Sequence, residues 1–410
     1  MGIDFSLSDE QAMLRDTARD FAENEIDSVA QEVHDEDIAH PWQRVRPVFE
    51  KATELGFTTL LVPREYGGEG GDLIDHVLLM EEFGATDIGI ALSYFNNTIT
   101  STKIISEGGT EAQRERWLNE LTSLDAPLLT GAQNEPDVAG SDLYYMGDDP
   151  DVGLQTYAER DGDEYVINGN KAAFCTNAGI SDYYFVVART SLDEPAFRST
   201  SVFFVPEDAD GLEAGQRTEL LGWKTAHHAE VRLDDVRVPA DALIGETEGN
   251  TDEYFPQVMP ALLTGFAACY IGLARRAYER AMEYAHQRES WGEPIVNHQA
   301  VKLRLAEMYA DVRKARLMVW DAAHAVETGD PEAPAKAYQA KTGAVDMAIQ
   351  NAERAVKMLG GYGVAEDSTP AKLLGDAWTG WPVDGTRETM RIDMVDHLLR
   401  LRGEDPPSSP

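Results

Sequence analysis

The sequence predicts a mainly α-helical protein with a central β domain. We expect an N-terminal helical domain over residues 1–127, a small antiparallel β-barrel or sandwich over 128–247, a C-terminal four-helix bundle over 248–402 and a disordered tail over 403–410. Hydrophobic residues recur every three or four positions in the outer thirds of the chain, as amphipathic helices require. Short β-branched and aromatic runs separated by turn residues fill the middle third, as in a compact β domain.

The N-terminal third contains clear helix signals. Ser8 and Gln11 form the Ser-x-x-Gln pattern of a capping box, and further helices are expected around 47–55, 75–83 and 112–121. The glycine-rich loop after Gly56 reads as tight turns. Its glycines do not complete a dinucleotide-binding motif and no strand precedes them, so we reject that interpretation.

The remaining elements follow from turn and break signals. Asp161-Gly162 separates two strand-like runs and predicts a hairpin. A regular apolar seam runs from Leu305 to Val326, and Gly329-Asp330-Pro331 interrupts it. We therefore predict a further helix over 333–359 and a last one after Gly385.

The charge of the chain narrows the classes of partner. Acidic residues number 73 and basic residues 35, which gives a net charge of −38. Such a surface repels phosphate backbones and anionic lipids, so we expect neither nucleic-acid nor membrane binding. Acidic residues spread along the whole chain also suggest adaptation to high salt, which screens their repulsion.

The chain also lacks export and disulfide signals. No basic region followed by an apolar stretch opens it, and its two cysteines cannot build a disulfide framework. The uncharged segment over 254–274 contains Pro256 and Pro260, and its strongly apolar part is shorter than a bilayer needs. We read it as a buried helix and expect a cytoplasmic protein.

No metal site is predicted. His227 and His228 are neighbours, and adjacent residues of a strand point to opposite faces. The sequence shows no metal-ligand spacing, phosphate-binding loop or hydrolase nucleophile motif. The candidates that remain are five strings: NEPDVAGSD at 134–142, FCTN at 174–177, RESWG at 288–292 followed by HQ at 298–299, KMLGGYG at 357–363, and DGTR at 384–387.

In this order, over roughly residues 5–401, the strings resemble the acyl-CoA dehydrogenase family of flavoproteins. Each string alone has a plainer interpretation as a turn, a core side chain or a helix cap, and the series makes the resemblance specific. It implies FAD, removal of two hydrogens from the α and β carbons of an acyl-CoA thioester, and electron transfer to electron-transferring flavoprotein. It also implies a homotetramer or dimer in which two subunits touch each flavin.

The resemblance assigns roles to individual positions. Phe174 would lie against the flavin face, Thr176 would bond the flavin nitrogen that accepts hydride, and Arg288 would reach a partner subunit's FAD. The full set of expected cofactor contacts is Gln133, Asn134, Ser141, Phe174, Thr176, Arg288, Trp291, Gln299, Lys357, Gly360, Gly361 and Thr386. Ser141 and Gly385 are also expected to contact the substrate. Asn134 and Lys357 depart from the family's usual Thr and Gln.

The resemblance implies that Asp384 is the catalytic base, although the family commonly has Glu at this position. A carboxylate in a dry site can remove a proton acidified by a thioester. The CoA-contacting residues of the family are also replaced, by Pro260 and Leu263. Two alternatives therefore stay open: a flavin oxidase of a small carbon acid, similar to nitroalkane oxidase, which belongs to this family and uses Asp, and a non-catalytic flavoprotein.

Overall fold

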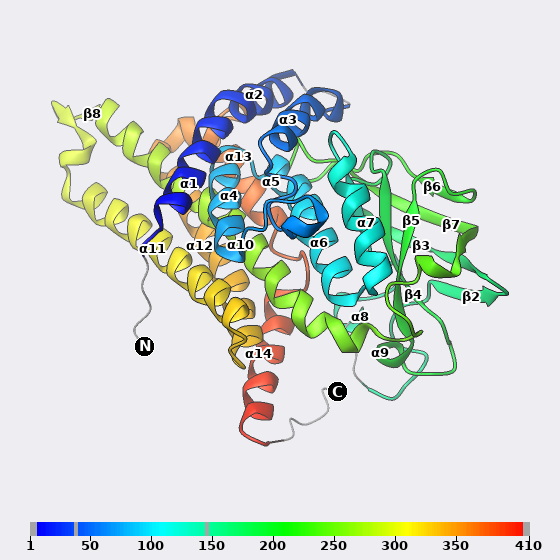
Figure 1. Ribbon diagram of the computed structural model, residues 1–410. Coiled ribbons are helices and arrows are strands. Elements are labelled where there is room, and N and C mark those ends of the chain that lie inside the picture. Colours follow the sequence, from blue (N-terminus) through cyan, green and yellow to red (C-terminus); the bar gives the residue numbers. More distant parts are fainter. Residues whose placement is uncertain (1–5, 37–39, 144–146, 405–410) are drawn as a thin grey trace.

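The computed structural model describes residues 6–36, 40–143 and 147–404. Helices form most of the molecule, and a β domain stands at one side of them (Figure 1). The predicted fold class is therefore confirmed. Most of the predicted tail, residues 405–410, lies outside the described residues.

The N-terminal domain is helical, as predicted. Its helices are α1 (Asp9–Phe21), α2 (Asp27–Glu36), α3 (Trp42–Glu54), α4 (Leu73–Thr86), α5 (Ile88–Phe95), α6 (Ser101–Lys103) and α7 (Glu111–Ser123), with π-helical turns at Ala22–Ile26, Asn96–Thr100 and Ile104–Gly108 and a 3₁₀ turn at Arg64–Tyr66. The capping box is present, because Ser8 accepts from the Gln11 amide and Gln11 accepts from the Ser8 amide. Helix α5 was not predicted: it is buried on all sides and lacks the amphipathic pattern that the prediction used.

The middle domain is a curled seven-stranded sheet. Its strands are β1 (Leu129–Ala132), β2 (Tyr157–Asp161), β3 (Glu164–Thr176), β4 (Tyr183–Arg189), β5 (Thr200–Pro206), β6 (Leu212–Ala214) and β7 (His228–Pro239); short helical segments at α8 (Gly140–Leu143), α9 (Ala196–Ser199) and Ala240–Ala242 accompany them. The order is β1-β4-β2-β3-β7-β6, with β5 paired to β4. The hairpin at Asp161-Gly162 is confirmed.

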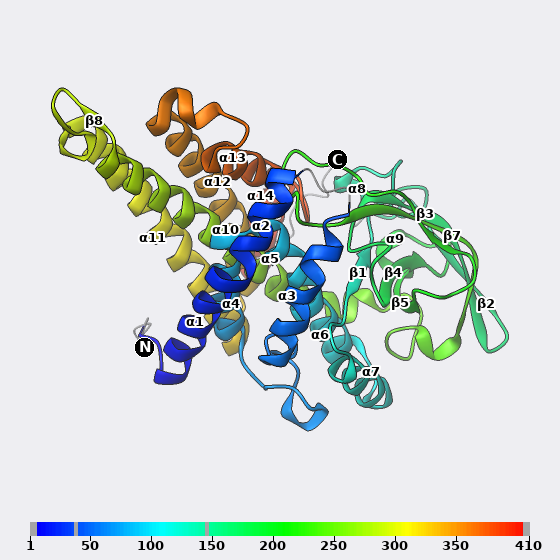
Figure 2. The same cartoon turned by 90° about the horizontal axis from the view of Figure 1, so that it is seen from above.

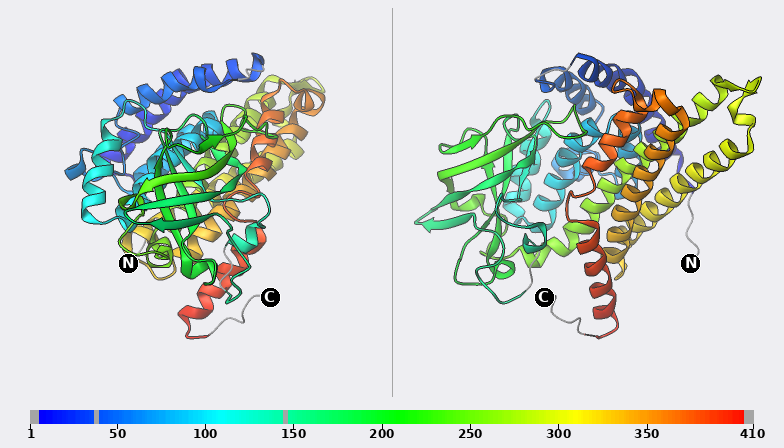
Figure 3. Two further views of the ribbon diagram at one scale, coloured as in Figure 1. Left: turned by 90° about the vertical axis from the view of Figure 1, so that its right-hand side faces the viewer. Right: turned by 180° about the vertical axis from the view of Figure 1, so that it is seen from behind.

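The sheet is not wholly antiparallel, which corrects the expected pairing. Strand β4 runs parallel to both β1 and β2. Parallel partners need a long connection, and here each is distant in sequence, so the turn signals used for the prediction could not reveal them. Figure 3 shows this sheet face-on and beside the helices.

The C-terminal domain is a bundle. Its helices are α10 (Thr251–Gln287), α11 (Gln299–Thr328), α12 (Ala333–Leu359), α13 (Thr369–Thr379) and α14 (Arg387–Leu401); the tip carries the short strands β8 (Glu289–Ser290) and β9 (Glu293–Pro294), and 3₁₀ turns lie at Ile295–Asn297 and Gly360–Val364. Helix α12 has the predicted bounds, whereas α13 was not predicted. Helix α10 is long and apolar enough to cross a membrane, but 83% of its most apolar stretch is buried inside the protein.

Glycine allows α4 and α10 to approach each other closely. A Cβ at Gly84 would lie 2.2 Å from the Cys269 carbonyl oxygen, and one at Gly272 would lie 2.2 Å from the Glu81 carbonyl oxygen. Both clashes involve backbone, so neither helix could accept a side chain at these positions without moving. The N-terminal domain and the bundle thus share one core.

A buried ionic cluster joins all three domains. Lys372 of α13 lies 3.0 Å from Asp87, just before α5, and 3.0 Å from Asp376. Asp376 in turn accepts from the Trp223 amide of the middle domain at 2.7 Å, and Thr225 donates to Asp87. Burial opposes the charge of Lys372, but the two carboxylates outweigh it and raise the pKa of Lys372. The cluster fixes the middle domain against the helices.

Candidate functional site

The loop after β1 is held by a buried ion pair. Lys171 of β3 donates to Glu135 Oε1 at 2.8 Å, to the Gln133 carbonyl at 3.2 Å and to the Val187 carbonyl at 2.7 Å. Glu135 also accepts from the amides of residues 155 and 156 at 2.6 and 3.0 Å. Burial raises the pKa of Glu135, but Lys171 and these donors outweigh burial and lower it. The loop is therefore rigid while Asn134 stays exposed.

Strand β3 presents two of the predicted cofactor residues on one face. Phe174 is 59% exposed and Thr176 is half-buried, whereas Cys175 between them is buried in the core of the sheet. This alternation follows from the period of two in a strand. An exposed phenyl ring on a strand is a suitable surface for a flat aromatic ligand. Ser141 belongs to α8, but its side chain lies outside the described residues.

Asp384 occupies a strained turn before α14. Its φ of 54° lies in the left-handed region, and Gly385 follows with a φ of 101°. A Cβ at Gly385 would also come within 3.2 Å of Met390. Thr386 is the N-cap of α14 and accepts from the Thr389 amide at 3.3 Å.

The Asp384 carboxylate has no hydrogen-bond or ion-pair partner within the described ranges. The residue is accessible to solvent, yet surrounding protein raises the pKa of Asp384, and the positive charge of Lys341 opposes this effect. An unpaired carboxylate beside packed helices loses solvation, and this loss raises its pKa.

Lys341 also contacts this turn, and it was not predicted. It lies on α12, is 1% exposed, and donates to the Val383 carbonyl at 2.5 Å and to the Gly385 carbonyl at 3.0 Å. In the sequence, Lys341 stands out only as a charged residue on a helix face of otherwise small and apolar residues. Its contact with the turn depends on how α12 packs, which no local pattern encodes.

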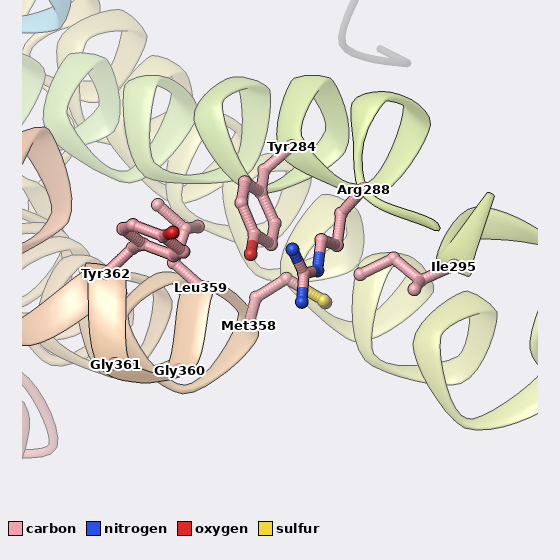
Figure 4. Close-up of a pocket in the computed structure, with 8 residues that line it drawn as sticks. All are labelled: Tyr284, Arg288, Ile295, Met358, Leu359, Gly360, Gly361 and Tyr362. Atoms are coloured by element: carbon pink, nitrogen blue, oxygen red, sulfur yellow. The ribbon is translucent and has the colours of Figure 1, made fainter. Parts of the chain in front are cut away.

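The bundle tip brings another group of predicted residues together. A cavity of about 520 Å³ lies between the end of α10 and the end of α12 (Figure 4). Its lining consists of Tyr284, Arg288, Ile295, Met358, Leu359, Gly360, Gly361 and Tyr362. Arg288 thus meets Gly360 and Gly361, which lie about seventy residues later in the chain. Gly360 ends α12 with a φ of 61°.

The other predicted residues of the tip do not line this cavity. Trp291 is 95% exposed and lies edge-on to His298, with ring centroids 5.8 Å apart. Gln299 is exposed at the first turn of α11. Lys357 is exposed and pairs with Glu353 at 3.2 Å.

The structure does not bring the two groups of cofactor residues together within one chain. The tip, marked by β8, lies at one end of the molecule, and β3 lies in the β domain at the other end (Figures 1 and 2).

The exposed residues fit a dinucleotide with a flat ring and a pyrophosphate. A Cβ built on Gly131, Gly360 or Gly361 would meet no protein atom within 4 Å, so a ligand can approach the backbone there. Arg288 forms no ion pair within the described ranges, and its guanidinium can donate two hydrogen bonds to a phosphate. No group of three His, Cys, Asp or Glu residues suited to a metal occurs among the described residues.

Fold and site together define a flavin-dependent oxidoreductase, and comparison with known proteins specifies the family. Models of the N-terminal, middle and C-terminal domains of acyl-CoA dehydrogenases match residues 8–125, 132–236 and 264–399. The chain is 34% identical to the probable acyl-CoA dehydrogenase YngJ of Bacillus subtilis, over 97% of this chain and all of that protein. It is 30% identical to the short-chain-specific acyl-CoA dehydrogenase of Clostridium acetobutylicum, over 97% of this chain and 100% of that protein.

Comparison with solved structures supports the same family. Butyryl-CoA dehydrogenase from Megasphaera elsdenii superimposes with a TM-score of 0.88 at 29% identity, over 97% of this chain and 100% of that chain. The chain therefore belongs to the acyl-CoA dehydrogenase family. It is an enzyme of this family, its cofactor is FAD, and the predictions of family and cofactor are confirmed. The roles of individual site residues and the exact domain bounds remain predictions.

Proposed function

We propose that this enzyme removes two hydrogens from the α and β carbons of an acyl-CoA thioester, with Asp384 as the base. FAD, when bound, accepts the hydride from the β carbon. The observation that carries the proposal is the Asp384 carboxylate: it is unpaired among the described residues, and protein around it raises its pKa. A carboxylate in this state accepts a proton more readily than one held in an ion pair.

The turn that carries Asp384 supports the same role. Its backbone is left-handed at Asp384, and Thr386, not Asp384, caps the N-terminus of α14. Asp is one methylene shorter than the family's usual Glu. The substrate α carbon must therefore lie about 1.5 Å nearer to the backbone.

Thioester substrates are supported by the relatives. Butyryl-CoA dehydrogenase from Megasphaera elsdenii and the short-chain-specific enzyme of Clostridium acetobutylicum match over their full lengths. We also propose electron-transferring flavoprotein as the electron acceptor. A chain from a study of the electron transferring flavoprotein of Acidaminococcus fermentans is similar at a TM-score of 0.88 and 29% identity, over 97% of this chain and 100% of that chain.

We further propose that the functional unit is a homo-oligomer in which two subunits hold each FAD. The β3 face would receive the flavin ring, and the tip cavity of a second copy, with Arg288, Gly360 and Gly361, would receive the pyrophosphate. The support is the separation of these two groups within one chain (Figure 2). A cytoplasmic location and adaptation to high salt also remain proposals.

The deciding experiment is an anaerobic titration of the purified holoenzyme, in high salt, with acyl-CoA esters of different length and branching. We expect one class of ester to bleach the flavin absorbance, and Asp384→Asn to retain bound flavin while losing the bleaching. Bleaching at an unchanged rate in Asp384→Asn would refute the assignment of the base. A flavin that no thioester bleaches would refute the substrate class.

A second candidate is a flavin oxidase. It is favoured by Asp at the base position and by the likeness to the prolyl acyl carrier protein oxidase AnaB, which has a TM-score of 0.86 at 25% identity. Oxygen consumption with peroxide release during turnover would establish the oxidase. Electron transfer to an artificial acceptor without peroxide supports the dehydrogenase. A protein that binds FAD but reduces it with no substrate would fit the non-catalytic alternative.

A further inference from the structure

Lys341 is a buried cation without a counter-ion of its own. It projects from the middle of α12 and is 1% exposed, and no carboxylate lies within ion-pair distance of its Nζ in the described ranges. Its ammonium lies 5.4 Å from the ring centroid of Phe266 on α10, which is a cation–π contact. Removing such a charge from water is unfavourable unless hydrogen bonds compensate for the lost solvation.

The compensating bonds go to the turn that presents the base. Lys341 donates to the Val383 carbonyl at 2.5 Å and to the Gly385 carbonyl at 3.0 Å, which are the carbonyls on either side of Asp384. The ammonium therefore holds the backbone of this turn from both ends. It does not bond the Asp384 carboxylate, which leaves that group able to accept a proton.

The turn needs such support. Asp384 and Gly385 are consecutive residues with φ of 54° and 101°. Left-handed backbone is unfavourable for a residue with a side chain and persists only where surrounding structure enforces it. Two charge-assisted hydrogen bonds from one rigid helix provide that enforcement.

The positive charge of Lys341 also affects the protonation of the Asp384 carboxylate. Burial lowers the pKa of Lys341 to about 8, and Asp384 and Asp346 oppose that decrease. Another titratable group near this turn is Tyr270 of α10, whose pKa is raised by burial and also by the negative charge of Asp384. Asp346 is held by Arg387 of α14 at 3.2 Å. Below pH 8 the Lys341 ammonium is thus the positive charge that counteracts the desolvation of Asp384.

We infer that Lys341 is a positioning residue for the base. Its ammonium fixes the left-handed turn that presents Asp384, and its charge keeps the carboxylate ionised and ready to accept a proton. The inference rests on the proposed role of Asp384 as base.

The test compares variants by the pH dependence of anaerobic flavin bleaching. Lys341→Gln keeps a donor and removes the charge, so the acid limb of the rate profile should move to higher pH. At pH 6 we expect about tenfold slower bleaching than in the wild type, and a smaller difference above pH 8, where Lys341 of the wild type loses its proton. Lys341→Arg keeps the charge and should keep the acid limb while slowing the rate at every pH.

The matched control is Lys336→Met. Lys336 lies on the same helix but pairs with Asp321 and Asp330 at 3.3 and 3.0 Å, and no hydrogen bond joins it to the turn at Asp384 within the described ranges. Its loss should leave the acid limb unchanged. An acid limb in Lys341→Gln that coincides with the wild type, at full FAD content, would overturn the inference.

Hydrogen exchange separates failure of this inference from failure of the proposed function. We expect faster amide exchange over residues 381–387 in holoenzyme carrying Lys341→Gln, and no change there in Lys336→Met. This readout needs no substrate, so it holds even if no thioester bleaches the wild-type flavin. Equal exchange in Lys341→Gln and the wild type would refute the positioning role. Lys341→Met, which removes both the donor and the charge, provides the same comparison if Lys341→Gln does not fold.

Discussion

Removing the positive member of the buried ion pair that holds the loop after β1 should be strongly destabilising. Lys171 and Glu135 lie 2.8 Å apart, with side-chain exposures of 0% and 4%. Lys171→Met leaves the Glu135 carboxylate buried without its counter-ion, a change that costs about 3–5 kcal/mol in buried pairs. Two backbone amides still donate to Glu135, at 2.6 and 3.0 Å, so we expect the lower end, about 3 kcal/mol.

The pH dependence of this penalty has a definite sign. In the wild type the pKa of Glu135 is lowered, so its contribution to stability is present above the pKa of the unfolded chain and is lost as the pH falls through the lower folded value. In Lys171→Met burial is no longer opposed by a cation, and Glu135 should bind a proton more readily. The difference in stability between variant and wild type should therefore shrink as the pH is lowered.

Urea unfolding monitored by circular dichroism, at several pH values, measures the loss. Lys51→Met serves as the control, because Lys51 pairs with Glu25 at the surface with exposures of 52% and 35%. Such a pair contributes about 0–1 kcal/mol. The double variant Lys171→Met with Glu135→Gln should recover part of the stability, since no buried charge remains. A loss below 1 kcal/mol in Lys171→Met, independent of pH, would refute the reasoning.

Three further predictions concern Asp384, Arg288 in the tip cavity, and the net charge of the chain. Asp384→Asn should slow flavin bleaching by at least about a hundredfold. It should also raise stability at neutral pH, because a carboxyl group whose pKa is raised by folding destabilises the protein above that pKa; thermal unfolding of the two holoenzymes checks this. Arg288→Ala should weaken FAD binding at least about tenfold, measured by flavin fluorescence on dilution, and mixing it with Asp384→Asn subunits should restore activity only if two subunits share each flavin. Stability should rise between 0.1 and 2 M KCl, because salt screens the repulsion within a chain of net charge −38, and an unchanged unfolding temperature would contradict this.

The sequence alone was sufficient wherever a local pattern carries the structure. The Ser8–Gln11 cap, the hairpin at Gly162 and the bounds of α12 depend on residues within a few positions of one another, and all were predicted. The series of five strings was enough to assign the family and FAD, because the strings keep their order along the chain even where single residues such as Asn134, Lys357 and Asp384 depart from the family's usual types. Asp384 was singled out in the same way.

Tertiary structure decided what depends on distant contacts. Helix α5 is apolar all round because other elements cover every face, and β4 is parallel to β1 because the chain returns from far away. Lys341 meets the turn at Asp384 only because α12 packs beside it. Burial and partners of this kind set the pKa of a group and the shape of a turn, and they arise from packing between segments that no local pattern relates.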